Sequence, residues 1–317
     1  MKLVGRLILA VLLTWLGASS AWAQGAQGDE LPRFRVDVRA SQYVVRVFDQ
    51  DDRVVRGLTA QDFSVLEDGR RRPVEQVEEQ PKANVSLAIL LDVGSTMSQE
   101  KILLGREIMH RLIHLLDEKD EILLGVFSDD VDFVSELSSD RYHLVEGIEN
   151  IGSGARASKW RRLGQLFMSQ ALTGYAVDHT LRRLKTCSYP SNKAVLVISA
   201  GFGGIGEATL DHLRMAGARF FGISLGNRAG DMISLGGDQA ARKRIVRETG
   251  GWAYSEKEAL DKIEAMRDAL SHYYLLTYQP AEEGKDLTKR EVEIGLQGHP
   301  GLRVSYVRRT SSGSSIY

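Results

Sequence analysis

The chain has 317 residues, of which 41 are lysine or arginine and 42 are aspartate or glutamate, so its formal net charge is −1. The basic residues are scattered along the sequence, and this pattern argues against a nucleic-acid-binding surface. A single cysteine, Cys187, excludes an intrachain disulfide. We interpret it as a small apolar filler rather than as a catalytic thiol.

The first 23 residues have the composition of an export signal. Two basic residues precede an apolar run over residues 7–16, and residues 21–23 read Ala-Trp-Ala. A basic start, a short apolar centre and an A-x-A ending are typical of a secretory signal peptide that is cleaved after the last alanine. A membrane anchor is the alternative, but the run is shorter than the ~20 residues that a spanning helix requires. We therefore expect a periplasmic or secreted protein that is not inserted in a membrane after cleavage.

Residues 24–83 are predicted to form the first part of a β-sandwich. Between residues 34 and 80 the sequence has short runs in which apolar and polar residues alternate, as in strands with one buried face. The Asp-Gly pair at 68–69 indicates a tight hairpin turn. This segment alone offers too few strands to bury a sheet face, since an isolated hairpin is marginally stable at best.

Residues 84–272 are predicted to form an α/β domain. Almost wholly apolar runs are typical of strands buried on both faces of a parallel sheet, and they lie at 86–92, 122–127, 194–199 and 219–225. Segments with helical periodicity separate these runs. The helices are expected at 98–120, 140–149, 175–185, 206–216, 238–249 and 257–271. Strands that alternate with helices predict a doubly wound, mostly parallel sheet of the Rossmann-like class.

Residues 273–309 return to a strand pattern, with three short strands expected. Like the N-terminal flank, this segment has too few strands to form a sandwich by itself. The two flanks are therefore expected to build one β-sandwich together, with the α/β domain inserted between them. The tail at 310–317, rich in serine and glycine, is expected to be disordered.

Four stretches, taken in chain order, resemble those of one family. They are "VRGLTAQDFSVLEDG", "VSLAILLDVGSTM", "LLGVFSDDVDFVSELSSDR" and "GGWAYSEKEALDKIEAMRDALSHYYLLTYQP". The chain resembles exported bacterial proteins with a von Willebrand factor type A domain, in particular the VWFA-related group first recognised in acidobacteria. The likeness covers nearly the whole chain after the predicted signal peptide. It implies an α/β domain that binds protein partners and carries out no known chemistry.

The resemblance also implies a place for a divalent cation. In metal-binding members of the wider family, the first strand ends in Asp-x-Ser-x-Ser, a second loop supplies a threonine and a third supplies an aspartate. Mg²⁺ requires a near-octahedral shell of oxygen atoms at ~2.1 Å. In this chain Asp92 stands at the first position, Gly94 replaces the first serine, and Thr96 replaces the second, with the hydroxyl of Ser95 beside it.

The second and third loops depart further from the family pattern. Tyr175 stands at the threonine position, although a two-residue shift would bring Thr173 there instead. Ala200 stands where the third loop should supply its aspartate, which leaves one carboxylate to face a dication. Glu207 is a nearby carboxylate that would have to compensate. The sequence therefore predicts a vestigial site with no bound metal and no other cofactor, and Mg²⁺ or Mn²⁺ binding is the alternative.

Loss of the metal does not remove the crevice at the carboxyl ends of the strands, where ligands of open α/β sheets bind. We expect a partner-binding face there that includes Gly94, Thr96, Tyr175, Ala200 and Phe202. The aromatic rings of Tyr175 and Phe202 suit a protein contact. They are equally consistent with filling the space that the ion would have occupied.

Other candidate sites are weaker. His110 and His114 have the spacing of a zinc-binding helix, but no protease glutamate accompanies them, and we interpret them as part of a solvated face. The glycines at 201–206 lack the G-K-[ST] ending of a phosphate loop. The aspartates at 129–132 lack the spacing of a calcium loop and indicate a polar turn. No serine lies in a G-x-S-x-G elbow.

The sequence thus predicts a non-enzymatic, exported protein-interaction module whose partner is another protein. One alternative is an assembly scaffold that binds through its β-sandwich, with the α/β domain as a spacer. The others are an adhesion module that still depends on metal and a hydrolase without a recognisable motif.

Overall fold

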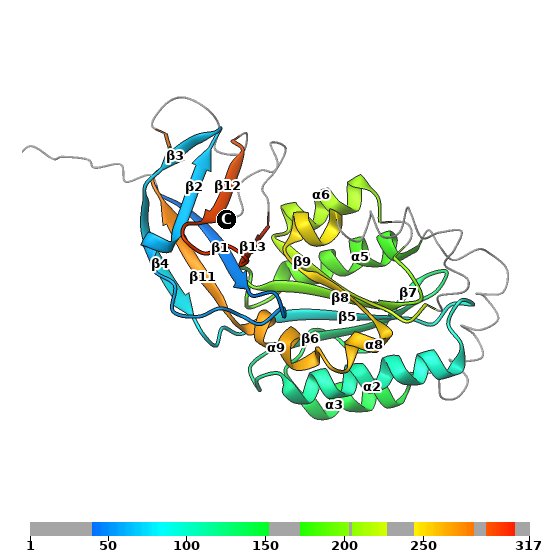
Figure 1. The fold of residues 1–317 in the computed structure, drawn as a ribbon. Coiled ribbons are helices and arrows are strands. Elements are labelled where there is room, and N and C mark those ends of the chain that lie inside the picture. Colours follow the sequence, from blue (N-terminus) through cyan, green and yellow to red (C-terminus); the bar gives the residue numbers. More distant parts are fainter. Residues whose placement is uncertain (1–39, 152–171, 203–204, 227–243, 282–289, 308–317) are drawn as a thin grey trace, which may run out of the picture. The chain divides into compact units, whose positions relative to one another are not determined.

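The computed structural model describes residues 40–151, 172–202, 205–226, 244–281 and 290–307 (Figure 1). The predicted signal peptide and the predicted disordered tail lie outside these ranges, as does the first half of the predicted helix at 238–249, whose second half, 244–249, is helical. Within the described ranges, the strands form one six-stranded, one four-stranded and one three-stranded sheet. None of the described helices is long and apolar enough to cross a bilayer.

The six-stranded sheet has the strand order β10-β9-β8-β5-β6-β7, and all neighbours are parallel except β6 and β7. Its strands are β5 (Ser86–Asp92), β6 (Glu121–Phe127), β7 (Val131–Phe133), β8 (Lys193–Ser199), β9 (Ala218–Ser224) and β10 (Trp252–Ser255). Every residue of β5, β8 and β9 is buried. The predicted mostly parallel α/β sheet is therefore confirmed, and its continuous apolar runs reflect cover on both faces.

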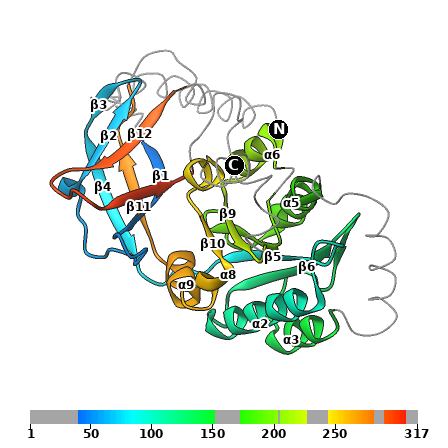
Figure 2. The same cartoon turned by 45° about the vertical axis from the view of Figure 1, so that its right-hand side comes forward.

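Helices pack on both faces of this sheet (Figures 1 and 2). One face is covered by α2 (Gln99–Leu115), α3 (Arg141–Glu149), α8 (Glu256–Ala259) and α9 (Ile263–Ser271). The other is covered by α5 (Leu172–Arg183) and α6 (Glu207–Met215). Alternate residues of β5 enter the two cores: Leu87, Ile89 and Leu91 face α2, whereas Ala88 and Leu90 face α5. This is the doubly wound arrangement.

Two details of the α/β part differ from the sequence prediction. The single helix expected at 257–271 is two helices, because the chain leaves helical geometry at Lys262 (φ −100°, ψ 5°) before α9 begins. This break orients α9 so that Ile263, Met266 and Leu270 all enter the core. The edge strand β10 was not predicted, since it has only four residues and follows directly on a glycine pair.

The remaining strands form two antiparallel sheets with the orders β13-β1-β11-β4 and β12-β2-β3. Their bounds are β1 (Ser41–Phe48), β2 (Phe63–Glu67), β3 (Arg70–Arg72), β4 (Val74–Gln80), β11 (Tyr273–Tyr278), β12 (Val292–Leu296) and β13 (Arg303–Tyr306). One hydrophobic core unites the two sheets and takes side chains from both flanks. The N- and C-terminal flanks therefore build one β-sandwich, as predicted.

The turn between β2 and β3 has the predicted hairpin geometry. Asp68 and Gly69 have φ angles of 49° and 75°, so both lie in the left-handed region. A type I′ turn requires this conformation at its two central residues, which is why Asp-Gly is favoured there. The turn fixes the register in which Val65, Leu66 and Glu67 pair with the three arginines of β3.

Two buried arginines connect β1 to the α/β part. The Arg46 and Arg219 side chains, each 2% exposed, both donate to Asn192 Oδ1 over 2.7 Å. Both also donate to the carbonyl of Ala269, over 3.0 and 2.8 Å. Ala269 lies in the last turn of α9, where the helix dipole presents its negative end to the two guanidinium groups.

Candidate functional site

The predicted site lies where β5 and β8 end. These strands are parallel neighbours, so Asp92 and Ser199 reach the same edge of the sheet. Asp92 is only 6% exposed, and its Oδ2 accepts a hydrogen bond from Ser199 Oγ at 2.7 Å. Its Oδ1 accepts a hydrogen bond from the backbone N–H of Gly94 at 2.8 Å. Both carboxyl oxygens of Asp92 are thus engaged by the protein itself.

The environment of Asp92 disfavours its charged form. Burial raises the pKa of Asp92, and the hydrogen bonds from Ser199 and Gly94 only partly oppose this effect. A second carboxylate at the position of Ala200 would add negative charge that only a cation could offset. With alanine there, Asp92 is held by two neutral donors instead.

The loop after β5 places its hydroxyls in solvent. Ser95 and Thr96 are exposed, whereas Gly94 and Met97 are buried. The N–H of Met97 donates to the Gly94 carbonyl at 3.1 Å, which closes a tight turn. Ser98 then caps α2 by accepting a hydrogen bond from the backbone of Lys101. The loop therefore presents two hydroxyl groups outward, next to a buried carboxyl group.

Tyr175 lies in the first turn of α5 and is 43% exposed. Its ring contacts that of His179, one helical turn further on, with the centroids 4.3 Å apart. Thr173, which a shift in alignment would place at the ligand position, is 3% exposed. The aromatic ring of Tyr175 is therefore available at the surface, whereas the side chain of Thr173 is enclosed.

Phe202 was expected on the exposed partner-binding face, but its side chain is buried. Its side chain is 1% exposed and packs edge-on against Phe220, with centroids 5.8 Å apart and planes at 88°. The ring also covers Gly222 on β9, where an added Cβ would lie 2.6 Å from Phe202 Cζ. The ring thus fills internal space that the missing side chain of Gly222 leaves free. Phe202 must be removed from the predicted partner-binding face.

These residues do not fit a divalent cation. Asp92 is the one carboxylate among the five family positions, and its oxygens already accept hydrogen bonds. Gly94 and Ala200 offer no side-chain oxygen, and Mg²⁺ needs close to six oxygens in fixed geometry. Glu207 forms an ion pair with Arg244. Within the described residues, no group of three or more histidine, cysteine or acidic side chains could hold a metal ion.

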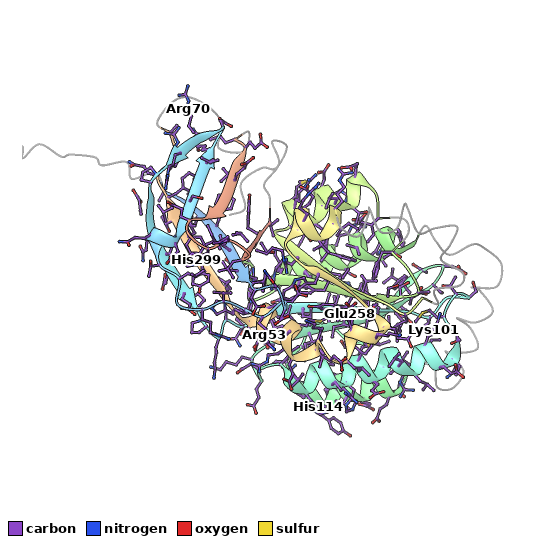
Figure 3. All side chains as sticks on the ribbon, viewed as in Figure 1. Arg53, Arg70, Lys101, His114, Glu258 and His299 are labelled. Atoms are coloured by element: carbon purple, nitrogen blue, oxygen red, sulfur yellow. The ribbon has the colours of Figure 1, made fainter. Side chains whose placement is uncertain are left out.

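The other candidate sites remain as weak as their sequences indicated. The rings of His110 and His114 lie 4.6 Å apart on α2, and Figure 3 shows His114 on the side of the helix away from the sheet. The aspartates after β6 form a tight connection, in which Ser128 N–H donates to the Asp130 carbonyl at 3.0 Å. The side chain of Asp130 accepts from Val131 N–H at 2.8 Å. This is the geometry of a polar turn.

The sequence did not reveal two residues that shape this edge. Ser199 holds Asp92, and Gly222 makes room for Phe202. The position of Ser199 at the end of an apolar run was a usable signal, because parallel strand ends converge. Gly222 gave no such signal, since its effect depends on the side chain of Phe202, in the loop that follows the adjacent strand β8.

No protein-family model matches the sequence, and no curated protein matches it. Similar solved structures include an aerotolerance-related membrane protein from Bacteroides fragilis, with 16% identity and a TM-score of 0.46 over 59% of this chain and 98% of that one. BatB from Bacteroides thetaiotaomicron has 15% identity and a TM-score of 0.44 over 59% of this chain and 100% of that one.

A von Willebrand factor type A protein from Catenulispora acidiphila is also similar, with 11% identity and a TM-score of 0.42. The match covers 87% of this chain and 75% of that one. The similarity to all three structures is a similarity of fold, at 16% identity or below. We therefore base the function of this chain on its own residues.

Proposed function

We propose that this chain is a non-enzymatic, exported protein-interaction module whose binding face lies at the carboxyl edge of the six-stranded sheet and works without metal. The observation that carries the proposal is that both carboxyl oxygens of Asp92 accept hydrogen bonds from the protein itself. The donors are Ser199 and Gly94, while Ser95, Thr96 and Tyr175 stay exposed on the surrounding loops.

The chemistry of this face suits a protein partner. Tyrosine is enriched among the residues that dominate binding energy, since its ring buries a large area and its hydroxyl can hydrogen-bond. The hydroxyls of Ser95 and Thr96 can exchange water for polar groups of a partner. Catalysis finds little support here, because Asp92 is bonded on both oxygens and is poorly placed to act as a base.

A scaffold that binds through the β-sandwich is the second candidate. The observation in its favour is the edge strand β3, on which Arg70 and Arg71 are exposed. Figure 3 shows Arg70 beside the β2–β3 hairpin. Edge strands offer unpaired backbone groups to a partner, although exposed charge commonly protects such edges from pairing.

Affinity capture from the cell envelope separates the two candidates. We expect Tyr175→Ala combined with Thr96→Ala to weaken partner binding at least tenfold, since loss of a hot-spot residue costs about 2 kcal/mol or more. The matched variant Arg70→Glu/Arg71→Glu, on the sandwich, should leave the same partners bound. Retention by the first variant and loss by the second would place the contacts on the sandwich and contradict the proposal.

A further inference from the structure

Residues 70–80 form one edge of the β-sandwich, which we call the β3–β4 edge (Figure 1). β3 is the outer strand of the three-stranded sheet, β4 is the outer strand of the four-stranded sheet, and only Pro73 separates them. Among the described strands, β3 has β2 as its single neighbour and β4 has β11. Each strand therefore keeps one unpaired side, and such sides offer N–H and C=O groups to a further strand.

The β3–β4 edge carries four exposed charged side chains. Arg70 and Arg71 are exposed on β3, and Glu75 and Glu78 are exposed on β4. Within the described part of the chain, none of these four side chains forms an ion pair or a hydrogen bond. The edge thus has two arginines and two glutamates whose charges are compensated only by solvent.

The chain cannot pair these charges with one another. Arg71 and Glu75 are the nearest residues of opposite sign among the four, and they are four positions apart. In an extended chain, four positions correspond to about 13 Å along the strand. The other charged residues of the edge do pair within the chain, since Arg72 contacts Glu67 and Glu79 contacts His272.

The order of the charges makes the β3–β4 edge complementary to itself. The arginines come first and the glutamates follow, so a second copy that runs in the opposite direction places its glutamates beside the arginines of the first. Opposite charges across neighbouring strands are stabilising, and like charges directly opposite each other are destabilising. A strand that carried charges of one sign would be repelled by half of this edge.

The charges also favour one register. Pairing two copies along the whole of β4 would set Glu75 opposite Glu79, which are like charges. A shift that sets Arg71 opposite Glu78 also sets Val74 opposite Glu75. The twofold axis then passes between Val74 and Glu75, so each contact between the copies occurs twice. An isologous interface, in which the same surface of both copies is used, has this property.

We propose that this chain forms a twofold-symmetric dimer through the β3–β4 edge, in which Arg71 of each copy pairs with Glu78 of the other. Exposed charge commonly prevents an edge strand from pairing. On this edge it disfavours strands of other sequences and favours a second copy. The dimer is independent of the proposed partner-binding face, because Thr96 and Tyr175 lie outside the β3–β4 edge and stay exposed.

Sedimentation equilibrium of the full chain tests the dimer without any substitution. We expect dimers that dissociate on dilution, with a Kd that rises at least about tenfold between about 0.05 and 0.5 M NaCl, because salt screens exposed charge pairs. Amides of residues 74–79 should exchange hydrogen more slowly at high than at low protein concentration, since β4 gains a neighbour. A chain that stays monomeric at about 100 μM, well above a micromolar Kd, or a dimer indifferent to salt, would overturn the proposal.

Charge reversal locates the contact. Arg70→Glu/Arg71→Glu and Glu75→Arg/Glu78→Arg should each weaken self-association at least about tenfold, because each variant sets like charges opposite each other. An equimolar mixture of the two variants should form mixed dimers, since their edges then carry opposite charges. A dimer of wild-type strength in either variant alone, or no association in the mixture, would contradict the β3–β4 contact.

A matched control separates this contact from a general effect of net charge. Arg182→Glu/Lys185→Glu changes the net charge by the same amount as the reversal of the two β3 arginines, at exposed positions at the end of α5 and in the turn that follows it. This variant should dimerise as the wild type does. An equal weakening in the control would mean that net charge, and not the β3–β4 edge, governs self-association.

Discussion

A chain that ends after Ser271 is expected to lose the whole β-sandwich while the six-stranded sheet and the helices described on its two faces stay folded. The deletion removes β11, which lies between β1 and β4, and it also removes β12 and β13. Strand β1 then has neither of its two partners. The core loses the side chains of Tyr274, Leu276, Tyr278, Ile294 and Tyr306. The strands that remain cannot form a stable sheet, since an isolated hairpin is marginal in water.

Limited proteolysis checks this expectation at residues 41–80, which should be cleaved rapidly in the truncated chain. A chain that ends after Val307 serves as the control, because it keeps all three C-terminal strands. Residues 41–80 should resist cleavage in that control as they do in the full chain. Equal resistance in the chain that ends after Ser271 would mean that the N-terminal strands fold independently of the C-terminal ones.

Asn192→Leu is expected to destabilise the protein by about 3–5 kcal/mol, because it removes an acceptor shared by two buried guanidinium groups, and hydrogen bonds to charged groups are worth about 1.5–3 kcal/mol each. Asn192 Oδ1 accepts one hydrogen bond from Arg46 and one from Arg219. Burial lowers the pKa of Arg46 to about 9, and burial together with the charge of Arg46 lowers the pKa of Arg219 well below its usual value. Loss of the shared acceptor leaves two buried like charges with fewer contacts.

The substitution also removes two hydrogen bonds from Asn192 Nδ2 to the carbonyls of Asn84 and Leu270, both 2.9 Å long. Urea denaturation at constant pH measures the loss. Asn150→Leu is a suitable control, since Asn150 is exposed at the end of α3 and its replacement should change stability by about 0.5 kcal/mol or less. A loss below about 1 kcal/mol for Asn192→Leu would show that the carbonyls of α9 suffice for both arginines.

The layers of the fold were predictable because the local pattern of apolar residues indicates which strands are buried on both faces. The apolar run at 86–92 predicted β5 to the residue, and the Asp-Gly pair at 68–69 predicted a hairpin turn. The union of the two flanks followed from counting strands, since neither flank could bury a sheet face alone. Each of these inferences needed only the length and pattern of a single segment.

The inferences that failed depended on contacts between distant segments. Phe202 is enclosed because Gly222, on the neighbouring strand, leaves space for its ring. The break at Lys262 depends on how α9 must turn to reach the core. Side-chain partners across the sheet are not encoded in local periodicity.

The residues at the expected metal-ligand positions were only partly predictable from the sequence. The sequence alone showed that Gly94 and Ala200 stand at expected ligand positions and that neither has a side-chain oxygen. It was not sufficient to anticipate that Ser199 would donate to Asp92. That hydrogen bond strengthens the case for a metal-independent face, because a cation would have to compete with donors already in place.

The most direct test of a metal-free face is the melting temperature in millimolar Mg²⁺ or Mn²⁺. A ligand that binds only the folded state adds about 2.7 kcal/mol of stability at a hundredfold excess over its Kd. For a protein of this size, that corresponds to a rise in Tm of several degrees. We expect no such rise in the wild type. The variant Gly94→Ser/Tyr175→Thr/Ala200→Asp restores the missing oxygens and should show it.

The reference for this measurement is Asp92→Asn, which keeps the size of the side chain and removes its charge. The account predicts that Mg²⁺ and Mn²⁺ leave the Tm of both the wild type and Asp92→Asn unchanged, and raise only that of the restored variant. A metal-dependent rise in the wild type that Asp92→Asn abolishes would contradict it. The sheet edge would then be a working metal site that uses Asp92 together with a ligand outside the family positions.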